Sequence, residues 1–274
     1  MQAPMKLNSF TGIGYGQKST VVLAVGPTYE EIQLRTNLDT ALIKRVAINL
    51  NGEEIYILQG QDLLMMEAYK DQPEIAGFLT IPFADITGKT KNGIKSTGLV
   101  TERGDNITLE VEVGTPADLG AAPSIDLSAW AVVSEPQPAR ILVPKIRPQT
   151  MQATAGGDNE FLSLVSGAGI SIRRMHFKSD KVTDLRIERD HRKVYESDKD
   201  YAQYLSKRNG KVPQAGIFHF DPVQRGFLLQ DLFPTAHSSE LKFTVTTTEP
   251  VGSLPILVES VEVVRPDLIA ALNR

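Results

Sequence analysis

The sequence predicts an all-β protein built as a double jelly roll, and three observations support this prediction. Most segments between Gly, Pro, Asn and Asp alternate between apolar and polar residues, as in NITLEVEV (106–113). Helical patterns are few and short. The chain also matches itself at a shift of 139 residues. Each copy holds about eight short strands, which suits a jelly roll, so we predict two tandem eight-stranded antiparallel barrels or sandwiches.

Composition sets limits on the class of protein. The chain has 274 residues, 41% of them hydrophobic, and a net charge of −4, so two ordinary globular domains are expected and bulk attraction to nucleic acid is not. The absence of cysteine excludes a disulfide framework, a thiolate zinc site and a cysteine nucleophile. No apolar run is long enough for a signal peptide or a membrane-spanning helix, so we expect neither.

Alternation and caps place the individual elements. In 107–113 the residues Ile, Leu and Val at every second position are expected to face a core, while Thr and Glu between them face water. Three helices are predicted, over 62–70, 197–210 and 266–273. Ser197 and Asp200 have the spacing of a capping box for the second of these helices.

An internal repeat supports the tandem arrangement. At the 139-residue shift, segment 44–57 falls on 183–196, and the turn Asn51-Gly52 falls on Asp190-His191. The same shift brings the first two predicted helices together and places Ala76-Gly77 on Ala215-Gly216. Further along, the shift falls by a few residues, so that Ile107, Leu109 and Val111 match Leu241, Phe243 and Val245. We interpret the repeat as a structural duplication.

Proline and glycine suggest where the domains begin and end. The glycines of GIGYG (12–16) do not follow a strand and open a helix, which favours a mobile arm over a nucleotide-binding loop. Four prolines in 134–149 argue against a central strand and favour a linker. We therefore predict an N-terminal arm (1–18), a first roll (19–135), a linker (136–158), a second roll (159–265) and a C-terminal helix (266–274).

The stretch DLRIERDHRKVYE (184–196) is unusually rich in charge. Its copy in the first roll keeps the apolar positions and changes the polar ones, so we expect the charges to lie on a hairpin. Leu185, Ile187 and Val194 are predicted to face the core. The predicted outward residues are Arg186, Glu188, Arg192 and Glu196, as on a solvated edge or a subunit contact.

No catalytic or cofactor-binding motif is found. The four histidines, His176, His191, His219 and His237, fall in different predicted strands or loops, and the His-x-His pair that a cupin uses to hold a metal is absent. His219 is interpreted as a strand residue. Hydrolase and nucleotide-binding motifs are also absent.

Two sets of charged residues remain as candidate ion or membrane sites. Asp198 and Asp200, or Asp71 and Glu74, offer oxygen ligands for calcium, with helix capping and solvated surface as the alternatives. Arg140, Lys145 and Arg147 are candidates for facing anionic lipid headgroups. An exposed linker is the alternative for these three residues.

Several segments, in order, resemble one family of viral proteins. They are GPTYEEIQLR (26–35), IKRVAINLNG (43–52), LSAWAVVSEP (127–136) and ISIRRMHFK (170–178). Together with the duplication, they resemble the major capsid proteins of corticovirus-type and autolykivirus-type bacteriophages, which are tailless, contain an internal membrane and carry double-stranded DNA. The resemblance covers most of the chain.

The resemblance implies a structural protein and not an enzyme. Three copies would form a pseudo-hexameric capsomer, and capsomers would tile the icosahedral capsid of the virion around the inner lipid membrane. Penton and minor capsid proteins would be partners, assembly would occur in the host cytoplasm, and no sequence-specific binding of nucleic acid is implied. No cofactor is required, although calcium is associated with some members. The alternatives are a carbohydrate-binding or trimeric ligand module and, disfavoured by the missing ligands, a cupin-like enzyme.

Overall fold

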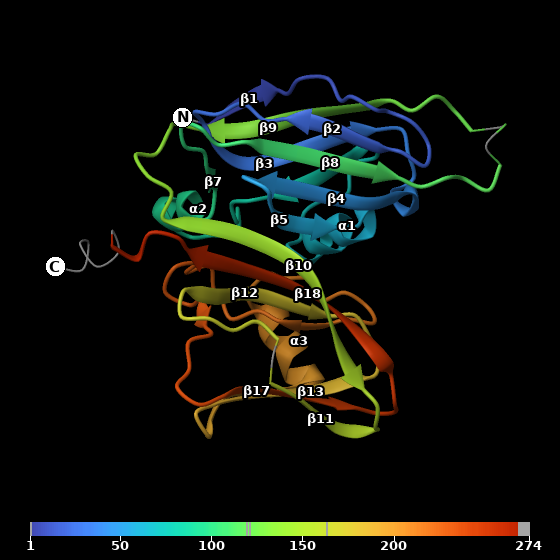
Figure 1. The fold of residues 1–274 in the computed structure, drawn as a ribbon. Coiled ribbons are helices and arrows are strands. Elements are labelled where there is room, and N and C mark those ends of the chain that lie inside the picture. The colour runs from blue at the N-terminus through green and yellow to red at the C-terminus, as the bar shows by residue number, and fades with distance from the viewer. Residues whose placement is uncertain (1, 119, 121, 163, 268–274) are drawn as a thin grey trace. The chain divides into compact units, whose positions relative to one another are not determined.

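The computed structural model of the chain describes residues 2–118, 120, 122–162 and 164–267 (Figure 1). They form two compact units, each mostly β. Unit 1 comprises Met1–Ala68, Gln72–Ile86 and Lys91–Pro144, and unit 2 comprises Tyr69–Asp71, Thr87–Thr90 and Lys145–Arg274. No helix within the described residues is long and apolar enough to cross a membrane.

Unit 1 contains two sets of four antiparallel strands. One set runs in the order β2-β8-β4-β5 and the other in the order β1-β9-β3-β6, with the short β7 also paired to β3. The strand bounds are β1 Ala3–Lys6, β2 Lys18–Val22, β3 Thr28–Thr36, β4 Ile43–Leu50, β5 Glu53–Leu58, β6 Phe78–Pro82, β7 Leu99–Val100, β8 Ile107–Val113 and β9 Leu127–Ser134. The helices are η1 Thr40–Leu42, α1 Gly60–Tyr69 and α2 Lys91–Ser96. As the alternation predicts, Ile107, Leu109 and Val111 of β8 are buried.

Unit 2 repeats this plan. Its strands run in the orders β11-β17-β13-β14 and β10-β18-β12-β15, with the short β16 also paired to β12. The bounds are β10 Leu142–Ala153, β11 Gly157–Phe161, β12 Ile170–Phe177, β13 Val182–Arg189, β14 Arg192–Asp198, α3 Lys199–Arg208, β15 Phe218–Phe220, β16 Phe233–Pro234, β17 Leu241–Thr247 and β18 Gly252–Val263. Side chains from both sets, such as Met175 of β12 and Phe243 of β17, share one buried apolar cluster. The sets therefore pack face to face, as the two sheets of a jelly roll do.

The predicted duplication is confirmed, and it extends to irregular features. At the 139-residue shift, β4 coincides with β13 and α1 with α3, residue for residue at both ends. The β4–β5 pairing shifts register between Ile48 and Asn49, and the β13–β14 pairing shifts between the equivalent residues Ile187 and Glu188. A bulge has no reason to recur by chance at matched positions, so the two units are copies of one fold.

The matched hairpins turn on the same backbone conformation. Asn51 and Gly52 have φ values of 53° and 88°, and Asp190 and His191 have values of 48° and 63°. Two successive residues with positive φ are typical of a two-residue hairpin turn. In unit 2 the carboxylate of Asp190 accepts hydrogen bonds from the backbone N–H groups of Ser238 and Ser239, at 2.9 and 2.7 Å. The bond from Ser239 is the main reason that the pKa of Asp190 falls to about 2, so the turn is held by a charged acceptor.

The first strand of each roll lies outside the predicted bounds of that roll. The predicted mobile arm (1–18) contains β1, which pairs with β9, and the predicted linker (136–158) contains the 12-residue β10. Pro144 and Pro148 lie inside β10. Each proline removes only one backbone donor, so the strand continues through both of them and the predicted linker is wrong for 142–153.

Two smaller predictions are also corrected. Val194 is predicted in the core but is 43% exposed. It is the unpaired residue of the bulge in β14, but the equivalent bulge residue Ile55 is fully buried, so the exposure of Val194 depends on what covers it and not on the bulge alone. The N-cap of α3 is Asp198 and not Ser197. The predicted C-terminal helix lies outside the described residues from residue 268 onward.

Candidate subunit contacts and a buried charged network

A bulge in β12 places two consecutive arginines in the interior of the protein. β12 pairs with β18, and the register shifts between Ile172 and Arg174, so that Arg173 is the extra residue. Ile172 and Met175 belong to the apolar cluster of unit 2, whereas Arg173 and Arg174 do not. Both arginines are nevertheless almost fully buried, at 1% and 0% exposure. Buried charges of this kind require compensating partners.

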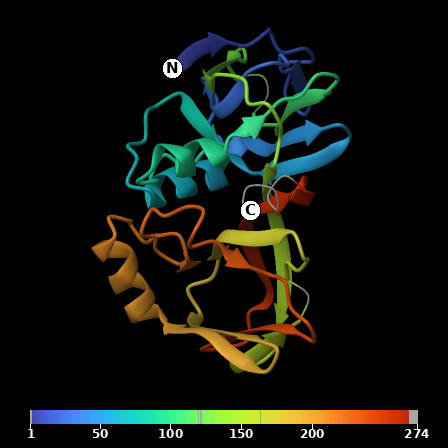
Figure 2. The same ribbon diagram turned by 90° about the vertical axis from the view of Figure 1, so that its left-hand side faces the viewer.

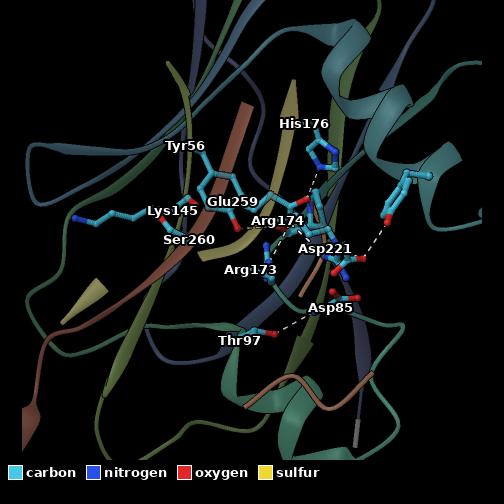
Figure 3. A network of polar contacts seen from close by, with 12 residues as sticks. Tyr56, Asp85, Thr97, Lys145, Arg173, Arg174, His176, Asp221, Glu259 and Ser260 are labelled. Atoms are coloured by element: carbon cyan, nitrogen blue, oxygen red, sulfur yellow. Dashed lines mark hydrogen bonds and ion pairs between the residues drawn. The ribbon is translucent and has the colours of Figure 1, made fainter. Parts of the chain in front are cut away.

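Buried carboxylates, Glu259 and Asp221 among them, compensate the arginines (Figure 3). Glu259 of β18 accepts from Nε of Arg173 at 3.0 Å and from Nη1 of Arg174 at 3.4 Å. Asp221, just after β15, accepts from Nε of Arg174 at 3.0 Å. Burial alone would raise the pKa of Glu259, but the two arginines beside it hold that pKa well below its usual range. Each arginine therefore faces at least one buried carboxylate.

Two histidines extend the network from Glu259. His176 Nε2 lies 3.0 Å from Glu259 Oε1, and His176 Nδ1 lies 2.7 Å from Nδ1 of His219. The backbone N–H of Gln214 donates to His219 Nε2 at 3.0 Å, so the proton of His219 must sit on Nδ1 and point at His176. His176 then carries its proton on Nε2 and donates to Glu259. Burial, followed by the neighbouring His176, lowers the pKa of His219 to about 2.

The chemistry of this cluster is structural. Arg173, Arg174, His176 and Glu259 are each no more than 1% exposed, so no substrate can reach them. Among the described residues no group of His, Cys, Asp and Glu is arranged to hold a metal ion, and the two guanidinium groups would repel a cation. His219 lies in a strand, β15, as the sequence predicts, but its contact with His176 was not predicted. The signal that could have found the cluster is the pair Arg173-Arg174 in an otherwise alternating strand.

The buried histidine predicts a specific loss of stability in acid. An unfolded His219 binds a proton below about pH 6.5, whereas the folded one stays neutral down to about pH 2, so its contribution is complete above 6.5 and is lost as the pH falls. The free energy of unfolding should fall with a slope of at most about 1.4 kcal/mol per pH unit from this group. We expect His219→Gln to flatten the slope between pH 6.5 and 5, measured by urea unfolding.

His237 provides the matched control, because it is exposed. His237→Gln should keep the wild-type slope. Equal slopes in wild type and His219→Gln would contradict the assignment of His219 as the acid-sensitive group.

The calcium candidates lie at the start of α3. Asp198 accepts the backbone N–H of Tyr201 at 2.7 Å as the N-cap, and Asp200 lies in the first turn. Helix capping therefore accounts for Asp198. Asp71 and Glu74 are exposed, and they lie far from the first pair in the sequence.

The three membrane candidates have different surroundings. Arg140 is only 8% exposed, and its guanidinium group makes two hydrogen bonds with Asp105, at 2.7 and 3.2 Å. A buried, paired side chain is not placed to meet lipid, so the structure argues against that role for Arg140. Lys145 and Arg147 lie on β10 and are partly buried, and Lys145 forms an ion pair with Glu262.

Exposed apolar side chains lie on and near α3, the orange helix in Figure 2. Tyr201 and Tyr204 are 53% and 54% exposed, and their rings stack with centroids 6.1 Å apart. Val194 on the preceding β14 and Val212 after the helix are each 43% exposed. Exposed apolar groups in one region are typical of a surface that binds another protein.

Comparison with known families identifies the chain. The family model described as the N-terminal domain of viral coat protein P2 matches residues 4–134, and the model for the C-terminal domain matches residues 143–264. The chain belongs to the viral coat protein P2 family. Its role is therefore structural and not enzymatic, and the resemblance to phage capsid proteins that the sequence indicated is confirmed.

Solved structures of other capsid proteins share the fold of this P2-family coat protein. The major capsid protein P2 of bacteriophage PM2 has a TM-score of 0.85 and 22% identity, with 96% of this chain and 98% of that chain covered. The major capsid protein of STIV, the Sulfolobus turreted icosahedral virus, has a TM-score of 0.70 and 11% identity, with 99% of each chain covered. VP54 of PBCV-1 has a TM-score of 0.65 and 8% identity, with 96% of this chain and 95% of that chain covered. No curated protein sequence matches the chain.

Proposed function

We propose that this coat protein is the major building block of an icosahedral phage capsid and acts as a homotrimer. The observation that carries the proposal is the duplication: two rolls with matched strands, helix and bulge in one chain. Three copies supply six similar rolls, so a trimer can tile a shell as a six-sided unit. Repeated head-to-tail contacts between identical subunits form a closed ring when the rotation from one subunit to the next closes, as a three-fold rotation does.

The proposal includes the wider setting of the capsomer. Capsomers meet one another, penton proteins and minor capsid proteins, and the shell assembles in the host cytoplasm around an inner membrane. Lys145 and Arg147 are the remaining candidates for contact with anionic headgroups, each contributing at most about 1 kcal/mol near such a surface. Asp198 and Asp200 remain the calcium candidates, with no cofactor required for the fold.

Light scattering coupled to size-exclusion chromatography tests the oligomeric state. The chain has a mass of 30.1 kDa, so a trimer has a mass of about 90 kDa. We expect that mass to persist on dilution. A stable monomer would contradict the proposal and would favour the alternative of a ligand-binding module.

A further inference from the structure

The internal duplication allows exposure to be compared at matched positions in the two rolls. Ile55 of β5 is fully buried, whereas its equivalent Val194 is 43% exposed. Asp62 of α1 is 6% exposed, whereas its equivalent Tyr201 is 53% exposed and is larger and more apolar. These two positions are therefore covered in the first copy and uncovered in the second, although both residues of the second copy, Val194 and Tyr201, have large side chains with apolar surface.

The end of α1 shows what this side of the fold binds. Within unit 2, which includes Tyr69–Asp71, the segment after α3 packs against these residues. The N–H of Val212 donates to the carbonyl of Tyr69 at 2.9 Å, and the Tyr69 hydroxyl lies 3.3 Å from Ser206 Oγ. The helix end thus contacts the stretch from the C-terminal half of the equivalent helix to the loop that follows it.

Because the two rolls are copies, the equivalent residues of each roll predict a second contact of the same kind. At the 139-residue shift, Tyr69 corresponds to Arg208 at the end of α3, and Val212 corresponds to Pro73. A repetition of the contact would therefore bring the end of α3 against residues around 73. Within the described part of the chain Arg208 is exposed and makes no ion pair, so that place is open to a second copy.

The exposed end of α3 and the exposed segment 71–78 carry opposite charges, and both expose apolar side chains. Lys207 and Arg208, beside Tyr204 at the end of α3, are exposed and positive. Segment 71–78, which follows α1, exposes the acids Asp71 and Glu74. The same segment exposes Ile75 and Phe78, at 60% and 40%. Opposite charges around apolar side chains are typical of specific protein contacts.

We propose that α3 of one copy docks on segment 71–78 of a second copy, with Tyr201 and Tyr204 on the apolar side chains and Arg208 facing Glu74. The two surfaces differ, so the contact is head-to-tail, and three repetitions close a ring. This proposal rests on the proposed trimer and names the surface that holds it together.

Substitutions on α3 test the contact in the full-length protein. Tyr201→Ser combined with Tyr204→Ser, and separately Arg208→Glu, should raise the dissociation constant of the trimer about 10-fold or more, since aromatic residues and arginine dominate contact energies. Because these side chains are exposed, circular dichroism and thermal unfolding of the monomer should be unchanged. Arg103→Glu, an exposed charge reversal outside both surfaces, is the control and should leave the trimer intact.

A charge exchange tests the pairing directly. Glu74→Arg alone should weaken the trimer, and Glu74→Arg combined with Arg208→Glu should restore most of the lost affinity. A double variant that binds more weakly than either single variant would overturn the pairing. A wild-type chain that stays monomeric refutes the trimer and this contact together, whereas a trimer that survives all the α3 substitutions refutes the contact alone.

Discussion

Replacing Glu259 by Gln is expected to lower the free energy of unfolding by about 3–5 kcal/mol. Glu259 is 1% exposed and accepts from Arg173, Arg174 and His176. A neutral amide would remove the carboxylate charge that faces both buried guanidinium groups. The cost arises from the weaker compensation of buried charge and not from lost packing, because Gln has nearly the same volume as Glu. Urea unfolding at neutral pH measures the change.

A second glutamate gives the matched control. Glu249 forms an ion pair with Lys181 at 2.8 Å, but the two side chains are 57% and 40% exposed. Glu249→Gln should therefore change the free energy of unfolding by less than about 1 kcal/mol. Equal losses of unfolding free energy in Glu259→Gln and Glu249→Gln would contradict the view that burial makes the ion pairs of Glu259 strongly stabilising.

Replacing Arg140 by Gln is expected to cost about 2–4 kcal/mol. Arg140 holds both oxygens of Asp105 and also donates to the carbonyl of Val100 at 3.1 Å. Burial opposes the charged form of Asp105, yet the hydrogen bond from Arg140 and its neighbours keep the pKa of that carboxyl below its usual value. Removing Arg140 leaves this carboxylate without its cation. Thermal and urea unfolding measure the loss.

The same variant separates stability from lipid binding. If Arg140 serves the fold, Arg140→Gln should lower stability and leave binding to vesicles that contain an anionic lipid unchanged. Arg103→Gln in the same region, at an exposed position, should affect neither property. A variant that is as stable as the wild type but binds vesicles less well would instead support contact of Arg140 with the membrane.

The repeat made most of the fold predictable from the sequence. Alternation and turns recur at a constant shift through β4, β5 and α1, so one copy supports the interpretation of the other. The first strands were not predicted because β1 has only four residues and β10 contains two prolines, so neither sequence shows a clear strand pattern. Pairing with neighbouring strands in the sheet nevertheless makes both segments strands.

The buried network could be predicted less well. A bulge has no simple sequence signature, and only the bulge explains why Arg173 and Arg174 both leave the apolar face of β12. Likewise Val194 matches the buried Ile55 in sequence, but its exposure depends on what covers that side of the fold. Alternation predicts which face of a strand is apolar, and contacts between elements far apart in the sequence decide whether that face is covered.

Electron micrographs of the purified oligomer test the central claim most directly. If three chains of two rolls each form one six-sided capsomer, class averages along the symmetry axis should show a closed three-fold ring with six similar lobes. The α3 variant Tyr201→Ser/Tyr204→Ser should yield mostly single two-lobed particles under the same conditions. Wild-type particles that remain single two-lobed chains, or that form two-fold dimers, would contradict the account.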